Sequence, residues 1–299
     1  MVLPPHMGEA TEKSWTILEL INWTKGYLAR AGVEDARLSA EVLLAHVLGC
    51  PRIELYARFD HQPDPQKLAE YRELIRRASE LEPVAYLVGH REFYSLSMKV
   101  TPDVLIPRPE SEILVSEALN YLLACDQPPR MLDACTGCGC VAVATAVHVP
   151  QATVLATDIS APAVEVAAGN ARLHNVADRV RCRTAELLEI PEDCRDMLPL
   201  DVITANPPYV AKDEEVAETV RYEPPVALYA GRSGLEFIRR IVADAPALLR
   251  IGGALMLEFG FSQADDVRDI IADSEHFDEP TILRDRQDLE RTAVTIRVS

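Results

Sequence analysis

The stretch that decides the fold is residues 130–158, which read RMLDACTGCGCVAVATAVHVPQATVLATD. It opens with a short apolar run, Arg130–Asp133, passes through a glycine-containing turn and continues as a helix from Val141. A second apolar run, Thr153–Thr157, follows this helix. A strand, a helix and a strand in this order are typical of a parallel sheet whose strands are joined by crossing helices.

The same alternation continues towards the C-terminus. Further strands are predicted at Val180–Arg183, Asp201–Ala205, Ala254–Phe259 after a Gly252–Gly253 turn, Thr281–Arg284 and Thr292–Val298, and helices at Ala163–His174, Leu235–Leu249 and Gln263–Ile271. Because the last two strands lie close together in the chain, we expect them to pair as a hairpin. The sequence therefore predicts an α/β fold with a doubly wound, mostly parallel, seven-stranded sheet and an antiparallel last strand.

Towards the N-terminus the pattern changes. Apolar residues at helical spacing predict helices at Trp15–Ala31, Asp35–Leu48 and Pro65–Leu81, which form a small helical domain. Alternating residues then predict a β-hairpin, with one strand over Tyr94–Val100, a turn at 101–103 and a return over Val104–Ile106. We therefore expect three parts: a helical domain over 1–85, a hairpin linker over 86–110 and the sheet domain over 111–299.

The composition excludes several classes of protein. Hydrophobic residues make up 48% of the 299 residues, and runs such as Val141–Val147 are far shorter than the roughly 18 residues of a membrane span. The chain has 30 Lys and Arg against 47 Asp and Glu, a net charge of −17, which disfavours direct contact with nucleic acid. The 7 cysteines, in a sequence that shows no export signal at its N-terminus, favour reduced thiols and a cytoplasmic protein.

The turn at residues 135–139 indicates a ligand site. Gly137 and Gly139 allow backbone to approach a ligand, and the N–H groups that open the next helix favour an anionic group. Asp158 ends the following strand, where a carboxylate accepts hydrogen bonds from both hydroxyls of a ribose. The pattern predicts a nucleoside cofactor, and by itself it suits the nicotinamide dinucleotide of an oxidoreductase equally well.

Three of the cysteines, Cys135, Cys138 and Cys140, lie in the same turn. A zinc ion or an iron–sulfur cluster needs four ligands, and the remaining cysteines form no second close pair. We therefore expect no metal site and assign these small side chains to packing.

The loop Asn206-Pro207-Pro208-Tyr209 follows the predicted strand Asp201–Ala205. Because proline has no N–H, the loop presents acceptors, namely the side-chain carbonyl of Asn206 and the backbone carbonyl of Pro207. Two converging acceptors fit an NH₂ group, and the ring of Tyr209 offers a flat surface for a planar amide or base.

These motifs resemble those of the class I, Rossmann-like methyltransferases that use S-adenosyl-L-methionine to modify planar amides or exocyclic amines. Over nearly the whole chain the sequence is similar to the release factor glutamine N5-methyltransferases, which methylate the glutamine in the Gly-Gly-Gln loop of peptide chain release factors. This resemblance rests on Asn206–Tyr209 together with Glu82–Gly89, Phe93, Val104–Glu112, Tyr222–Pro225, Gly252–Gly253, Leu257–Glu258 and Asp285–Arg286.

The resemblance implies S-adenosyl-L-methionine as cofactor, release factors as protein partners, and no membrane or nucleic-acid partner. It implies a substrate-recognition role for 1–85 and cofactor binding and catalysis for 111–299. The implied cofactor-binding residues are Cys135, Thr136, Gly137, Cys138, Gly139, Asp158, Leu187 and Asn206. The implied substrate-binding residues are Asn206, Pro207, Pro208 and Tyr209, of which Asn206, Pro207 and Tyr209 serve in catalysis.

The sequence departs from the family pattern at two places. Cys135 and Cys138 stand where glycine and a small hydroxyl residue are usual, and Ala185–Leu187 stands where an Asp and a residue that packs on adenine are usual. The alternatives are glutamine methylation of a ribosomal protein and, with less support, N6-methylation of adenine in nucleic acid. A nicotinamide-dependent oxidoreductase leaves the loop at 206–209 without a role, and a noncatalytic binding module explains none of its chemistry.

Overall fold

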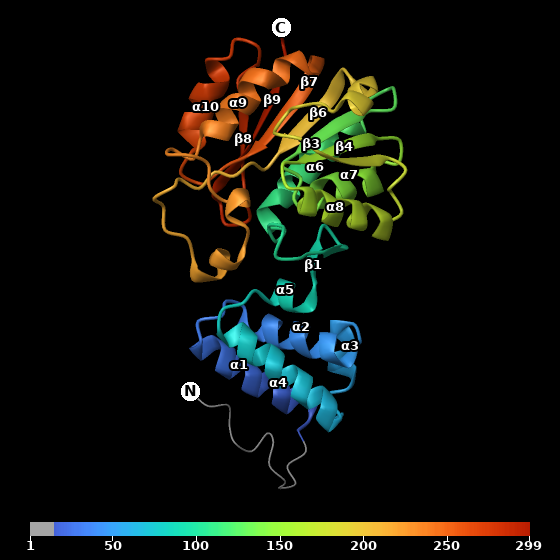
Figure 1. The fold of residues 1–299 in the computed structure, drawn as a ribbon, viewed down its shortest axis with the longest axis vertical. Helices are drawn as coiled ribbons and strands as arrows, with labels where there is room; N and C mark the ends of the chain where they lie inside the picture. The colour runs from blue at the N-terminus through green and yellow to red at the C-terminus, as the bar shows by residue number, and fades with distance from the viewer. Residues whose placement is uncertain (1–14) are drawn as a thin grey trace. The chain divides into compact units, whose positions relative to one another are not determined.

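The computed structural model describes residues 15–299. Within this range the chain divides into two compact units, with the boundary between Val88 and Gly89 (Figure 1). The expectation about an export signal falls on residues 1–14, which lie outside the described range. Among the described helices, none is both long enough and apolar enough to cross a membrane.

The first unit is helical, as the sequence predicts. Its helices are α1 (Ile17–Arg30), α2 (Ala36–Leu48), α3 (Arg52–Ala57), α4 (Pro65–Ser79) and α5 (Val84–Val88). Thr16 caps α1, since its hydroxyl accepts from the backbone N–H of Glu19 at 3.3 Å and the Glu19 carboxylate accepts from the N–H of Thr16 at 3.0 Å. The sequence does not predict α3 and α5, because helices of 6 and 5 residues are too short to show helical periodicity.

The hairpin that opens the second unit is present, but its predicted position is wrong. Its strands are β1 (His90–Phe93) and β2 (Leu96–Lys99), joined by a turn at Tyr94 and Ser95. Both turn residues have positive φ angles, 48° and 61°, the conformation that tight hairpin turns require. Neither residue type signals such a turn, whereas the Pro-Asp pair at 102–103 does, and Val104–Ile106 is not a strand.

The central sheet confirms the predicted α/β topology. Its strands are β3 (Arg130–Ala134), β4 (Thr153–Asp158), β5 (Val180–Thr184), β6 (Leu200–Ala205), β7 (Leu249–Glu258), β8 (Thr281–Arg284) and β9 (Glu290–Ile296). The strand order is β5-β4-β3-β6-β7-β9-β8. β9 runs antiparallel to both β7 and β8, and the other pairs are parallel.

Two predicted boundaries in this unit are wrong. The Gly252–Gly253 pair lies inside β7, where the register with β6 shifts between the pairs Leu200↔Leu249 and Val202↔Ala254, so it forms an irregularity within the strand. The helix predicted to reach Leu249 ends at Asp244, because Pro246 cannot supply the N–H that the next helical turn needs.

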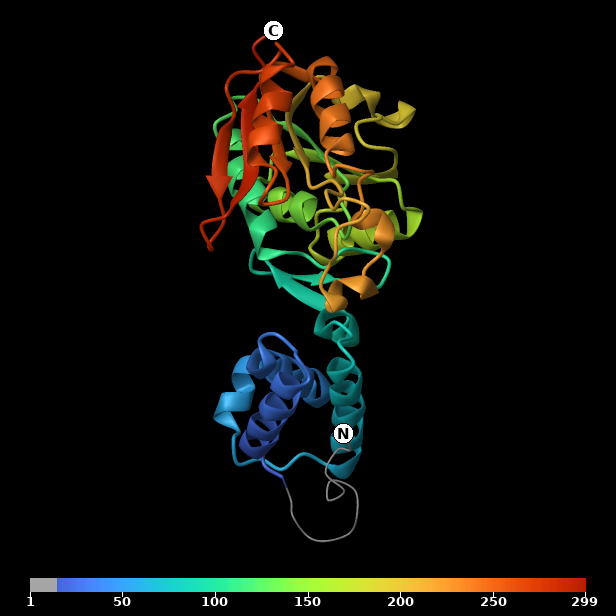
Figure 2. The same cartoon turned by 90° about the vertical axis from the view of Figure 1, so that its left-hand side faces the viewer.

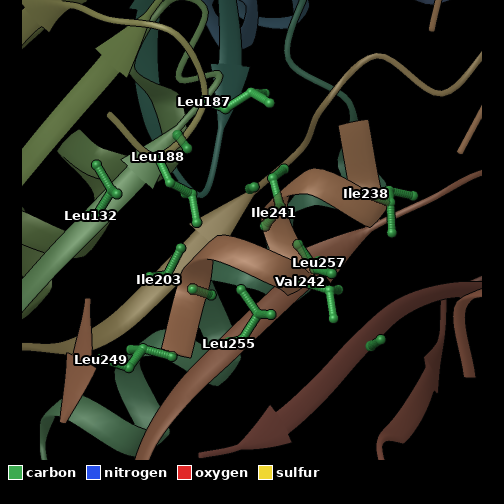
Figure 3. Close-up of a cluster of buried hydrophobic side chains, with 14 of the residues drawn as sticks. Leu132, Leu187, Leu188, Ile203, Ile238, Ile241, Val242, Leu249, Leu255 and Leu257 are labelled. Atoms are coloured by element: carbon green, nitrogen blue, oxygen red, sulfur yellow. The ribbon is translucent and has the colours of Figure 1, made fainter. Parts of the chain in front are cut away.

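Helices cover both faces of the sheet (Figure 2). α6 (Glu112–Leu122), α7 (Cys140–His148) and α8 (Ala161–Leu173) pack in sequence on one face, and α9 (Glu236–Asp244) and α10 (Ala264–Ala272) pack together on the other. Short 3-10 helices lie at Pro109–Ser111, Glu192–Met197, Glu218–Tyr222, Pro225–Ala227 and Ala245–Ala247. Ile238, Ile241 and Val242 of α9 meet side chains of the strands in a buried cluster (Figure 3).

The strand order places a crevice at one edge of the sheet. From β3 the chain proceeds outward through β4 and β5, then returns to β6 on the other side of β3. In parallel sheets, ligands bind where the strand order reverses in this way, beyond the carboxyl ends of the strands. The segments that follow β3, β4 and β6 therefore meet in a position suited to a binding site.

Candidate active site

The turn after β3 is held by backbone contacts. Its residues Cys135, Gly137 and Gly139 all have positive φ angles, 56°, 56° and 79°. A Cβ at position 139 would lie 2.9 Å from the Cβ of Ala167 in α8, so this glycine is required for helix packing. A Cβ at position 137 would meet no atom within 4 Å, so Gly137 leaves open space.

Asp158 lies at the end of β4, directly beside this turn. Its Oδ2 accepts from the N–H of Gly137 at 2.9 Å and its Oδ1 accepts from the N–H of Ser160 at 2.9 Å. Burial raises the pKa of the carboxyl above its usual value. The two backbone donors fix the orientation of the carboxylate and leave further lone pairs for a ligand.

Most of the predicted cofactor residues border a common cavity, which we call the main pocket. It is lined by Asp103, Val104, Leu105, Cys135, Gly137, Asp158, Ile159, Ser160, Ala163, Ala185, Glu186, Leu187, Asn206, Pro208, Val226, Ala227 and Phe237. Leu187 also belongs to the buried cluster of Figure 3, so the hydrophobic core extends to the wall of this pocket. Glu186 pairs with Arg240 at 2.6 Å.

A smaller cavity, the side pocket, shares Leu105, Cys135, Gly137 and Asn206 with the main one. It is also lined by Pro107, Arg108, Ser111, Asp133, Thr136, Cys138, Cys140 and Val141. Three predicted site residues, Gly139, Pro207 and Tyr209, line neither cavity. The sequence does not predict a place in the pocket for residues 103–105, 226–227 and Phe237, because these residues come from loops and a helix that carry no local ligand motif.

Asp133 joins the turn to the neighbouring strand. Its two oxygens accept from the hydroxyls of Thr136 at 2.5 Å and of Thr204 in β6 at 2.8 Å. Burial raises the pKa of this carboxyl to about 6. The hydroxyl proton of Thr136 is used by Asp133, its backbone N–H donates to the carbonyl of Thr157 at 2.9 Å, and its carbonyl accepts from the N–H of Gly139 at 2.8 Å, so Thr136 holds the turn in place and has no free donor to offer a ligand.

Of the cysteines in the turn, Cys135 and Cys140 are half-buried and border the pockets. Cys138 is buried, and burial raises the pKa of the Cys135 thiol, so that thiol stays protonated at neutral pH. Within residues 15–299 no group of three His, Cys, Asp or Glu side chains is arranged to hold a metal ion.

The Asn206 side chain is held in one orientation. Its Nδ2 donates to the Oγ of Ser111 at 3.2 Å, and that Oγ donates to Oε2 of Glu258 at 2.6 Å. The Oδ1 of Asn206 has no hydrogen-bond partner among the described residues and is available as an acceptor beside both pockets.

Tyr209 is fixed through its backbone. Its carbonyl accepts from Nε2 of Gln263 at 3.0 Å, while Oε1 of the same glutamine accepts from the N–H of Gly260 at 2.9 Å. A Cβ on Gly234 would lie 2.3 Å from that carbonyl oxygen, so glycine is required there. Burial raises the pKa of the Tyr209 hydroxyl to about 12, so it remains protonated.

This fold and this crevice define a Rossmann-like methyltransferase. The family model described as "Methyltransferase small domain" matches residues 111–263, and the one described as "PrmC N-terminal domain" matches residues 19–89. A release factor glutamine methyltransferase of Rhodopirellula baltica is 42% identical over 255 residues, which cover 83% of this chain and 85% of that protein. A protein of the same name from Geobacter sulfurreducens is 43% identical over 262 residues, which cover 86% of this chain and 89% of that protein.

The chain belongs to the release factor glutamine methyltransferase family. Among solved structures, the hMettl16 catalytic domain in complex with a hairpin of the MAT2A 3′UTR superposes with a TM-score of 0.55. The two sequences are 15% identical, and the match covers 92% of this chain and 91% of the hMettl16 chain, so the likeness concerns the fold alone.

Proposed function

We propose that this chain transfers a methyl group from S-adenosyl-L-methionine to the side-chain amide nitrogen of the glutamine in the Gly-Gly-Gln loop of peptide chain release factors. The proposal rests on membership of the family and on the chemistry of the residues around the crevice. A release factor substrate also implies that the enzyme acts in the cytoplasm, where translation takes place.

The main pocket suits this cofactor better than a dinucleotide. Its described lining includes the acidic residues Asp103, Asp158 and Glu186 and contains no Lys, Arg or His. Glu186 is paired with Arg240 and Asp103 is exposed, so the carboxylate of Asp158 is the charge in this wall that disfavours a pyrophosphate and suits the positive charge of a sulfonium. Asp158, already oriented by two backbone donors, has acceptor sites left for two ribose hydroxyls. Leu187 and Phe237 supply apolar surface for a base.

When bound, S-adenosyl-L-methionine supplies an electrophilic methyl group. An amide nitrogen is a poor nucleophile because its lone pair is delocalised into the carbonyl. We infer that Oδ1 of Asn206 and the backbone carbonyl of Pro207 accept the two N–H bonds of the glutamine amide and direct its nitrogen into the pocket. These acceptors stabilise the positive charge that builds on the nitrogen as its bond to the methyl group forms and the methyl–sulfur bond breaks. The nitrogen loses its surplus proton to water after the transfer, so no strong base is required. The ring of Tyr209 covers the amide and excludes water.

One observation carries this assignment: the hydrogen bond from Asn206 Nδ2 to Ser111 leaves Oδ1 as the available end of the amide. An available carbonyl oxygen matches a substrate that brings N–H groups, such as a glutamine amide. A release factor presents that amide on a protein loop, so we assign substrate recognition outside the crevice to the helical part of the chain, residues 1–85.

The test is methyl transfer from labelled S-adenosyl-L-methionine to three purified substrates in parallel: a release factor, ribosomal proteins and DNA or RNA. We expect label on the release factor alone, on the glutamine of its Gly-Gly-Gln loop, as located by mass spectrometry of peptides. A release factor whose glutamine is replaced by alanine is the matched control and should take up no label. Label on ribosomal protein or on adenine instead would refute the assignment, and binding of NAD in place of the methyl donor would refute the class.

A further inference from the structure

Three side chains from distant parts of the sequence form a chain of hydrogen bonds beside the crevice. Asn206 donates from Nδ2 to Ser111 at 3.2 Å, and Ser111 donates from Oγ to Glu258 at 2.6 Å. Ser111 is 3% exposed and Glu258 is 1% exposed, so water does not compete for the contact between them. Asn206 is half-buried and borders both pockets.

The sheet brings two of these residues together. Ala205 of β6 pairs with Leu257 of β7, so Asn206 and Glu258, the next residues of the two strands, lie side by side at the carboxyl edge. Ser111 reaches them from the 3-10 helix Pro109–Ser111, immediately before α6. The contact therefore depends on a segment 95 residues away from Asn206.

The chemistry of the three groups determines which of them donates and which accepts in each hydrogen bond. A carboxylate can only accept, so Glu258 takes the one proton of the Ser111 hydroxyl. The oxygen of Ser111 is then an acceptor for its remaining neighbour, and only the NH₂ end of the Asn206 amide can donate to it. The opposite end, Oδ1, is thereby turned away from Ser111.

We propose that Ser111 and Glu258 are positioning residues that fix the amide of Asn206 with its carbonyl oxygen towards the substrate. This inference rests on the proposed function only for the identity of the substrate amide. A site without this chain would allow the Asn206 amide to rotate and present NH₂ to the substrate NH₂, which is a repulsive pairing.

A role in packing alone does not explain why a glutamate occupies the buried position 258. Within the described residues, the hydroxyl of Ser111 supplies the only hydrogen bond that the Glu258 carboxylate receives, and no salt bridge compensates its buried charge. A buried carboxylate without a paired cation is unfavourable, whereas an apolar side chain would fill the same space at no such cost. Arg108 and Arg291 act on it only at longer range, in opposition to Glu110.

If Glu258 only filled space, the rate of methyl transfer would not depend on its protonation state, so the pH dependence of the rate distinguishes the two roles. Burial raises the pKa of Glu258 to about 7. The titratable and charged groups around it are Ser111 as donor, Glu110, Arg108, Arg291, Tyr209 and Cys140. Above that pKa the carboxylate only accepts and the chain has one direction. Below it the acid can donate to Ser111, whose proton is then free to turn to Asn206, so methyl transfer should fall as the pH drops through about 7.

The test compares Ser111→Ala, Ser111→Thr and Glu258→Gln in single-turnover methyl transfer to a release factor. Ser111→Ala should lower the transfer rate by about 10- to 100-fold, the usual effect of removing a partner that orients a reacting group, while the Kd for S-adenosyl-L-methionine stays near that of the parent. Ser111→Thr keeps the hydroxyl and should restore most of the rate. Glu258→Gln has no titrating group at this position, so its rate should no longer change as the pH passes through about 7. Ser116→Ala, at a half-buried position of α6 where the hydroxyl donates to the carbonyl of Glu112 at 3.0 Å, is the matched control and should change neither rate nor pH profile.

A second readout needs no substrate. In protein labelled with ¹⁵N-asparagine, the side-chain amide signal that disappears in Asn206→Ala should exchange slowly with solvent in the parent and faster in Ser111→Ala. If the parent transfers no methyl group to a release factor but this protection is present, the proposed function fails and the positioning chain stands. Parent-like exchange and parent-like transfer in a folded Ser111→Ala variant would overturn the positioning role.

Discussion

Replacing Asp158 by alanine tests the cofactor site most sharply. Its carboxylate lies at the wall of the main pocket with both oxygens already oriented by the N–H groups of Gly137 and Ser160. If it accepts from two ribose hydroxyls, the variant loses charge-assisted hydrogen bonds, which contribute about 1.5 to 3 kcal/mol in total at a half-buried position. That loss corresponds to an increase of about 10- to 150-fold in Kd.

Isothermal titration with S-adenosyl-L-methionine and with S-adenosylhomocysteine measures this change, and both ligands should lose affinity equally because they share the ribose. Asp103→Asn is the matched control, since Asp103 is an exposed acid that lines the same pocket. Its Kd should stay within about threefold of the parent, as expected for an exposed charge.

Asp158→Ala also removes the acceptor for two backbone N–H groups, so the unfolding of each variant without ligand must be measured as well. Asp158→Asn retains one acceptor oxygen and shape, and it separates the charge from the turn geometry. Parent-like affinity in a folded Asp158→Ala variant would contradict the ribose contact and place it elsewhere.

Further predictions concern the turn and the loop. Gly139→Ala should destabilise the protein by about 1 to 3 kcal/mol in urea unfolding, because it combines a positive φ with a Cβ contact of 2.9 Å to Ala167. Gly137→Ala should cost about 1 kcal/mol or less, because no atom lies within 4 Å of the added Cβ. Equal losses of stability in the two variants would refute the packing argument. Tyr209→Phe keeps the ring and should lower kcat/KM of methyl transfer by less than about fivefold, whereas Tyr209→Ala should lower it by at least about tenfold. An equally large loss in the phenylalanine and the alanine variants would show that the hydroxyl, not the ring, serves the reaction.

The sheet domain could be predicted because its signals are local. Each buried strand is a short apolar run bounded by a turn, and the strand–helix alternation over 130–158 determines parallel pairing. Since parallel strands present their carboxyl ends at one edge, the positions of Asp158 and Asn206 after two strands predict that both face one cavity, and both line the main pocket.

The features that escaped prediction depend on contacts between distant segments. The hairpin turn uses Tyr94 and Ser95 in a conformation that other residue types favour, so tertiary contacts such as that of the Tyr94 N–H with Glu112 determine it. Val226 and Phe237 complete the main pocket from outside any motif. Ser111 gains its role only where the chain brings it against Glu258, a pairing that no spacing in the sequence indicates.

The central claim is that the carbonyl oxygen of Asn206 orients the amide that receives the methyl group. The most direct test is single-turnover transfer from labelled S-adenosyl-L-methionine to a purified release factor, with the parent and a folded Asn206→Ala variant compared at saturating cofactor. We expect the variant to be slower by on the order of 10² to 10³, as for the loss of one preorganised catalytic hydrogen bond, with a far smaller change in the Kd for the cofactor. Transfer by Asn206→Ala at the parent rate would contradict the claim and leave residues 206–209 as a structural turn.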